Sequence, residues 1–95
     1  MKIRELRNGM RGVDVEGVIK SKGEVRNIVT RYGPARVVDA VLEDDTGEIV
    51  LTLWNENVDA VEEGDKVKIV NGYTSVFRGR LQLNIGRRGS IIVLD

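Results

Sequence analysis

Four aromatic side chains are the residues of this sequence best suited to chemistry: Tyr32, Trp54, Tyr73 and Phe77. Aromatic rings offer flat faces on which nucleic-acid bases stack, at about 1–3 kcal/mol per base and with little regard for base sequence. Arg is twice as frequent as Lys in the chain, and its guanidinium can both pair with phosphate and stack. The basic and polar candidates to accompany the aromatic rings are Arg31, Arg36, Lys66, Lys68, Arg78, Arg80, Gln82 and Thr52.

Each of these residues also has a purely structural interpretation. Trp54 could close one end of the core, Tyr73 stands where a strand is expected to end, and Phe77 could pack beneath its own loop. Tyr32 precedes Gly and Pro, so it is expected at an exposed loop tip. Any single Arg could lie on a solvated surface. The prediction of a binding site therefore depends on whether the fold brings the four rings together.

Catalysis is the least expected function. The chain has no Cys and no His, which excludes Ser–His and Cys–His nucleophiles and leaves a zinc site only carboxylate ligands. No two carboxylates are marked by their spacing as an acid and a base. Asp44, Asp45 and Glu48 resemble a metal site, but a solvated turn is the preferred interpretation. We expect no enzyme, no metal and no cofactor.

The zero net charge hides three segments of opposite sign. Residues 1–36 carry nine basic and four acidic side chains, residues 37–65 carry ten acidic and no basic ones, and residues 66–95 carry six basic and one acidic. Such a distribution is compatible with a basic groove and an acidic surface elsewhere. Because carboxylates in a groove would repel phosphate, we expect most of them to lie away from it.

The elements that must position these side chains are mainly strands, since Val and Ile together far outnumber Ala. Alternating apolar residues predict a long bent strand from Val13 to about Val29, interrupted by Gly17 and Gly23, after a short helical or irregular lead. Gly33 and Pro34 predict a loop. The further predictions are strands at residues 36–43 and 49–54, helical turns at 55–63, strands at 66–70 and 80–85 around a loop at 74–79, and a short last strand at 91–94.

A short helix between the third and fourth of five strands is the plan of the OB-fold, a Greek-key barrel. We therefore predict a single all-β domain over residues 1–95, a five-stranded OB-fold barrel. The rival is a small SH3-like barrel, which would not place a helix there. In an OB-fold, the face of strands 2 and 3 and the loops joining strands 1–2 and 4–5 form the ligand groove. Trp54 falls on the third strand, Tyr32 in the first loop, and Tyr73 and Phe77 around the second.

The stretch from residue 30 to 86 resembles the simple archaeal single-stranded DNA-binding proteins and their relatives among the DNA-binding domains of replication protein A. The resemblance rests on LEDDTG at 42–47, LTLW at 51–54, EGDKVKI at 63–69 and NGYTSVFRGRLQLN at 71–84. It implies base stacking on Trp54, Tyr73 and Phe77. The middle ring is often Trp in that family, and Tyr73 offers less area.

Together these observations predict a non-enzymatic domain that binds single-stranded DNA with low sequence preference, in replication, repair or recombination. Two alternatives stay open: an RNA- or tRNA-binding OB module, and a protein-interaction OB domain within a replication protein A-type assembly. The expected partners are single-stranded DNA, single-stranded RNA and replication or repair proteins, with no membrane. The sequence has no apolar run long enough for a signal peptide or a membrane span, so we expect a cytoplasmic protein, monomeric in solution.

Overall fold

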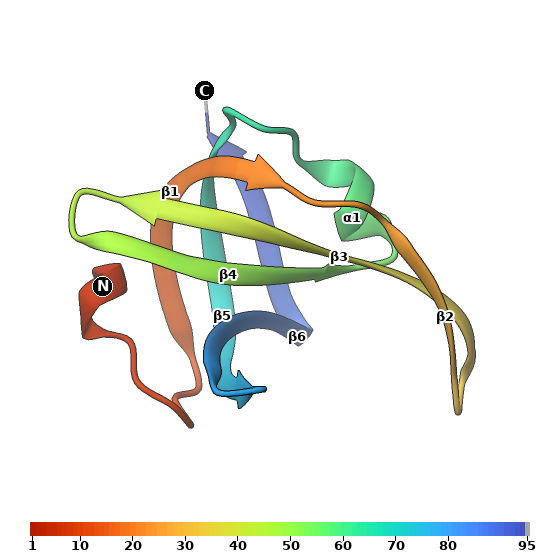
Figure 1. The fold of residues 1–95 in the computed structure, drawn as a ribbon. Coiled ribbons are helices and arrows are strands. Elements are labelled where there is room, and N and C mark those ends of the chain that lie inside the picture. Colours follow the sequence, from red (N-terminus) through yellow and green to blue (C-terminus); the bar gives the residue numbers. More distant parts are fainter. Residues whose placement is uncertain (95) are drawn as a thin grey trace.

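Strict alternation of buried and exposed residues starts the first strand, where Val13, Val15, Gly17 and Ile19 point inward. The computed structural model, which describes residues 1–94, continues with strands almost to the end of the chain (Figure 1). Its elements are the 3₁₀ helix η1 (Ile3–Glu5), β1 (Val13–Lys22), β2 (Arg26–Thr30), β3 (Gly33–Asp44), β4 (Gly47–Trp54), α1 (Glu56–Ala60), β5 (Lys66–Phe77) and β6 (Arg80–Leu94).

Five of the six strands close into a barrel. The neighbours follow the order β1-β5-β6-β4-β3-β2, and an additional pairing of β1 with β3 closes the ring. β1 serves both halves of the barrel: it pairs with β5 up to Val18 and with β3 from Val18 onward, with a register shift between Ile19 and Ser21. The predicted OB-fold is confirmed, including the helix between the third and fourth barrel strands. The number of strands differs from the prediction of five, because the structure has one more, β2, which lies outside the barrel.

The barrel interior is filled by aliphatic side chains. On β4, Ile49, Leu51 and Leu53 are buried together on one face. α1 closes one end with Val58. The fully buried residues of largest volume are Ile19, Leu42, Leu51, Leu53, Ile69, Leu83, Val13, Val15, Val38, Val58, Val61 and Val67. No aromatic side chain belongs to this core, so all four rings lie on the described surface.

The β2–β3 hairpin was not predicted, because Gly33 and Pro34 indicated a loop. Both residues belong to β3 and pair with β2, and the hairpin extends away from the barrel (Figure 1). The N–H of Arg36 points to Asn55, away from β2, and residues two apart direct their N–H groups to the same edge. The missing N–H of Pro34 therefore removes no bond from the hairpin ladder.

The last two strands are longer than predicted. β5 runs without a break to Phe77, so the predicted loop at 74–79 shrinks to a turn at Arg78 and Gly79. A bulge at Asn71 changes which residues face inward: Val67 and Ile69 before it, Gly72 and Thr74 after it. Tyr73, Ser75 and Phe77 consequently all point outward.

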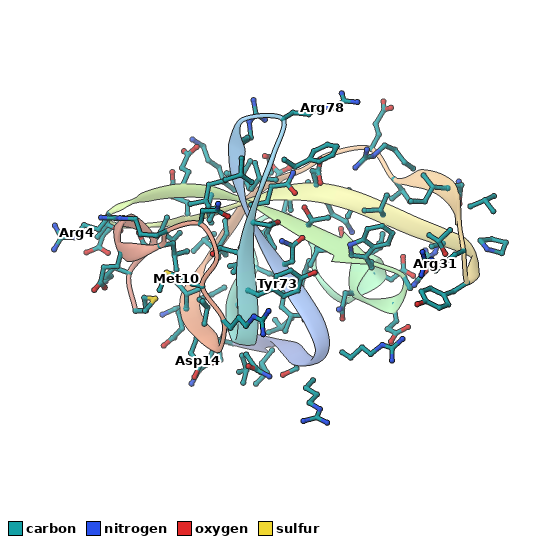
Figure 2. All side chains as sticks on the ribbon, turned by 90° about the horizontal axis from the view of Figure 1, so that it is seen from below. Arg4, Met10, Asp14, Arg31, Tyr73 and Arg78 are labelled. Carbon is teal, nitrogen blue, oxygen red and sulfur yellow. The ribbon has the colours of Figure 1, made fainter. Side chains whose placement is uncertain are left out.

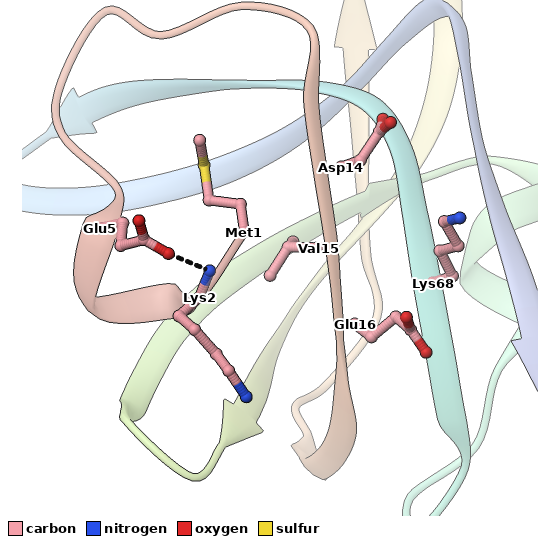
Figure 3. Close-up of a pocket in the computed structure, with 7 residues that line it drawn as sticks. All are labelled: Met1, Lys2, Glu5, Asp14, Val15, Glu16 and Lys68. Atoms are coloured by element: carbon pink, nitrogen blue, oxygen red, sulfur yellow. Dashed lines mark hydrogen bonds between the residues drawn. The ribbon is translucent and has the colours of Figure 1, made fainter.

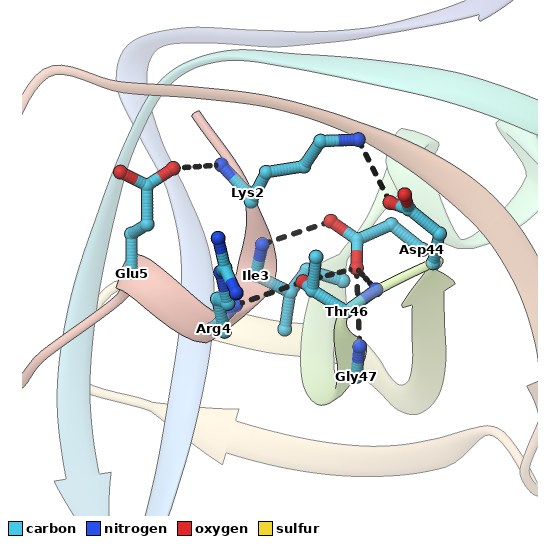
Figure 4. Close-up of polar contacts among 8 residues, drawn as sticks. Lys2, Ile3, Arg4, Glu5, Asp44, Thr46 and Gly47 are labelled. Carbon is cyan, nitrogen blue, oxygen red and sulfur yellow. Dashed lines mark hydrogen bonds and ion pairs between the residues drawn. The ribbon is translucent and has the colours of Figure 1, made fainter.

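The acidic turn between β3 and β4 anchors the N-terminal segment (Figure 4). The Asp44 carboxylate accepts hydrogen bonds from the Ile3 N–H at 2.8 Å and from the Thr46 N–H and hydroxyl at 2.7 and 2.6 Å. Desolvation raises the pKa of Asp44, but these bonds and one from the Gly47 N–H lower it by more, so that the pKa falls below its usual value to about 2. Lys2 pairs with Asp45 at 2.7 Å. The turn is therefore a docking point for η1.

None of the helices within residues 1–94 has the length and apolar character needed to cross a membrane.

Candidate nucleic-acid interface

Strand register places three of the four rings on one outer face of the sheet. Thr52 of β4 is paired with Asn84 of β6, and Asn84 is paired with Tyr73 of β5. Paired residues point to the same side, and so do residues two apart on one strand. Trp54 therefore shares the side of Thr52, and Phe77 that of Tyr73. We call the outer surface that carries Trp54, Tyr73 and Phe77 the aromatic face; it runs from β5 across β6 and β4 to β3 and β2.

A depression of about 280 Å³ lies between Trp54 and Phe77. Thr52 and Asn84, only 6% and 8% exposed, contribute to it with Gln82. Its remaining lining residues are Arg26, Ile28, Val37 and Asp39. The site thus combines ring edges and aliphatic groups with amide and hydroxyl groups, as a surface that stacks bases and hydrogen-bonds their edges requires.

Trp54 is the last residue of β4 and is held by the residue after it. Asn55 has φ +53°, and its side-chain oxygen accepts the Arg36 N–H at 3.1 Å instead of capping α1. The Arg36 guanidinium donates to the Asn55 carbonyl at 3.2 Å and to Asp59 at 2.7 Å. The hydrogen bond from Arg36 lowers the pKa of Asp59. Arg36 therefore orders the backbone behind Trp54. The sequence predicts it as a residue of the binding face, but the structure does not bring its side chain to the aromatic face.

Phe77 and Tyr73 are presented differently. The Arg78 guanidinium lies over the Phe77 ring, 5.3 Å from its centre, and the ring stays 56% exposed. Arg78 occupies the β5–β6 turn with φ +54°. Tyr73 is 42% exposed, and a Cβ placed on Gly86 would lie 3.5 Å from its ring, so the ring lies against bare backbone.

Tyr32 and Arg31 lie at the tip of the β2–β3 hairpin, and Tyr32 is 82% exposed. A second depression of about 650 Å³ connects this tip with Trp54, and its lining includes Arg31, Tyr32, Pro34 and Asn55. Figure 2 shows Arg78 at the β5–β6 turn, Arg31 at the hairpin tip and Tyr73 on the body of the sheet. The hairpin therefore extends the aromatic face beyond the barrel.

The remaining predicted basic residues have separate positions. Arg80 is paired with Phe77 at the border of the aromatic face, and it lines a depression together with Val50 of β4 and Leu81. Lys66 and Lys68 precede the β5 bulge and are paired with Leu94 and Ile92 of β6. Lys68 lies near Glu16 and Asp14 in another depression (Figure 3). The structure does not bring Lys66 and Lys68 to the aromatic face.

Sequence reasoning missed five residues of the central depression: Arg26, Ile28, Val37, Asp39 and Asn84. Asp39 accepts a hydrogen bond from the Thr52 hydroxyl at 3.2 Å and pairs with Arg26 at 3.4 Å. Its position follows from the pattern of the strand, because Val38, Ala40 and Leu42 share one face, which is buried, and Asp39 alternates with them. Arg26 and Ile28 could be placed only with the hairpin known.

Comparison with known proteins gives consistent relationships. Residues 8–93 match the family model described as single-stranded DNA binding protein Ssb-like, OB fold. The single-stranded DNA binding protein Ssb of Saccharolobus solfataricus is 36% identical over 90 residues, which are 95% of this chain and 61% of that protein. A replication factor A of Methanothermobacter thermautotrophicus is 29% identical over 86 residues, 11% of its length. This chain thus spans less than two thirds of these curated relatives.

Solved structures show the same fold. The replication factor A related protein from Methanobacterium thermoautotrophicum superposes with a TM-score of 0.83 at 28% identity, over all of this chain and 90% of that chain. An OB domain from Thermoplasma acidophilum superposes with a TM-score of 0.87 over all of this chain and 86% of that one, and at 24% identity it supports the fold alone. With a family model covering residues 8–93, this chain belongs to the Ssb-like family of single-stranded DNA-binding OB-folds.

Proposed function

We propose that this domain binds single-stranded DNA without enzymatic activity and with low sequence preference, by stacking bases on Trp54, Tyr73 and Phe77. The observation that carries the proposal is the register of β4, β6 and β5, which puts the three rings on one surface with Thr52 and Asn84 between them. Stacking accepts any base, because every base has a flat π-face. Tyr32 extends the row at the hairpin tip.

Phosphate contacts come from the basic residues that border the face. Arg31, Arg78 and Arg80 make no ion pair within residues 1–94, so their guanidinium groups are available to an anion. Gln82 and Thr52 supply hydrogen bonds to bases or sugars. A domain of this size should cover a handful of nucleotides, within the about 4–16 that one OB-fold occupies.

The proposed role is in replication, repair or recombination, and its replication part is supported by the relatives named replication factor A and replication factor A related protein. The match to the single-stranded DNA binding protein Ssb-like model and to the Ssb relative favours single-stranded DNA as the polymer. Nothing on the aromatic face is a dedicated reader of the RNA 2′-hydroxyl, so RNA is the comparison arm of the test.

The test is a titration followed by Trp54 emission, since Trp54 is the sole Trp of the chain and lies between two depressions of the face. Adding oligo-dT should quench the emission, and oligo-dA should do the same. Duplex DNA should give little change. Unchanged emission and no measurable binding of single strands at low salt would refute stacking on Trp54. Tighter binding of matched RNA than of DNA would assign the domain to RNA.

A further inference from the structure

The β6 strand carries a bulge whose apex is a pair of arginines. Gly72 is paired with Ile85 and Val70 with Ser90, so residues 86–89 of β6 stand opposite Asn71 alone. Gly86 and Gly89 flank the Arg87–Arg88 pair. A Cβ on Gly89 would lie only 2.9 Å from the Asn71 carbonyl oxygen, so the bulge folds tightly against β5.

The bulge is held in place by Asn71, which has φ +56°. Its side-chain amide donates to the Arg88 carbonyl at 3.4 Å, and its own N–H donates to the Asp14 carboxylate at 2.8 Å. The Asp14 carboxylate thus accepts a backbone donor of the residue that holds the bulge. The arginine side chains leave the bulge from an anchored backbone.

Arg11 joins Arg87 and Arg88 around a depression of about 520 Å³. All three are exposed and make no ion pair among the described residues. Gly12, Gly72 and Gly86 also line the depression and have no side chains to keep a ligand from the backbone, and Tyr73 is a further lining residue. We call Arg11, Arg87 and Arg88 the arginine cluster.

This arrangement suits a phosphate. Guanidinium groups present forked N–H donors that match phosphate oxygens, and three of them around one depression attract an anion strongly. The Tyr73 ring lies against Gly86, so a base stacked on it would carry its own phosphates toward Arg87 and Arg88. No equivalent depression lined by three arginines occurs elsewhere among the described pockets.

We propose that the arginine cluster is a second phosphate-binding site, which holds the backbone of the nucleotides following the base on Tyr73. The inference rests on the proposed single-stranded DNA binding. It extends the path of the strand from the aromatic face around β5 and β6, past the bulge, and makes the occupied length greater than the three stacking rings alone would give.

The test compares the Arg87→Gln/Arg88→Gln double variant with the unchanged protein on a long oligo-dT and on a short one that spans only the rings. Each lost phosphate contact should reduce the slope of log affinity against log salt by about 0.7, so the double variant should lose about 1.4 on the long strand. Between about 0.05 and 0.2 M salt, the unchanged protein should then lose about sevenfold more affinity than the variant. The short strand should show little difference.

The Lys66→Gln/Lys68→Gln variant is the matched control, because it removes two positive charges from β5 that lie outside both the aromatic face and the arginine cluster and form no ion pair with another residue within 1–94. It should leave the slope nearly unchanged. Equal slopes for the arginine variant and the unchanged protein would overturn the proposal. So would an equal loss in the lysine control, or an equal loss on the short strand, because either would indicate a general charge effect. If the unchanged protein binds no single strand, the proposed function itself fails.

Discussion

Replacing Phe77 with Ala should weaken single-stranded DNA binding far more than it weakens the fold. The ring is 56% exposed and belongs to no core cluster, so less than half of it contributes burial. Fully burying a Phe side chain is worth about 1.5–3 kcal/mol, and the less than half of Phe77 that is buried should therefore be worth about 1 kcal/mol. Loss of one stacked base should cost about 1–3 kcal/mol, a 5- to 150-fold rise in Kd.

The assay is a titration of oligo-dT followed by Trp54 emission, with thermal melting of the same samples. Val76→Ala is the matched control, since Val76 is 48% exposed and is the adjacent residue on the opposite side of β5. It should change neither Kd nor Tm appreciably, and Phe77→Tyr should restore binding. An unchanged Kd for Phe77→Ala would refute stacking on this ring, and a fall in Tm beyond about 8 °C would place Phe77 among the stabilising contacts instead.

Three further predictions concern the turn, the groove and the barrel. Asp44 should stabilise the fold above about pH 4 and lose this contribution as the pH falls through its pKa of about 2. After allowing for solvent screening, Asp44→Asn should lower the free energy of unfolding in urea by about 1–2 kcal/mol at pH 7, and a difference of the same size at pH 2 would contradict this. Asp39→Asn removes the carboxylate from the aromatic face and frees Arg26, so DNA binding should tighten by about 0.5–1 kcal/mol; weaker binding would show that Asp39 contacts the bases directly. Gly17→Ala would place a Cβ 2.6 Å from the Glu43 carbonyl oxygen, so unfolding by urea should become easier by about 1–3 kcal/mol, and an unchanged midpoint would refute the close approach.

The β3–β4 hairpin shows what could be predicted from the sequence. Its strands pair without a register shift, and the LEDDTG run supplies the turn, so the period of two puts Ile49, Leu51 and Leu53 on one face and Trp54 on the other, as the structure has them. A regular period of two determines the face of every residue until something shifts it. The OB-fold followed from the order of such elements and one short helix.

The bulges explain what could not be predicted. A bulge adds residues on one strand without a characteristic sequence pattern. The change of face at Asn71 and the bulge at residues 86–89 could therefore not be predicted from the sequence. Tyr73 and Phe77 were consequently assigned to a strand end and a loop. Arg36 shows a second limit: its ion pair with Asp59 joins segments whose proximity depends on the closed barrel.

The barrel closes at a narrow parallel seam. β4 and β6 share only the pairs Val50–Gln82, Leu51–Leu83 and Thr52–Asn84, whereas β3 and β4 are paired along their full hairpin. Parallel pairing is also slightly less stable per residue than antiparallel pairing, so thermal opening of the barrel should begin at this seam. A polymer lying across Thr52 and Asn84 would bridge both edges of the seam. Occupancy of the aromatic face would then slow amide hydrogen exchange in β6 beneath it, because the bound strand stabilises the closed barrel against opening at the seam.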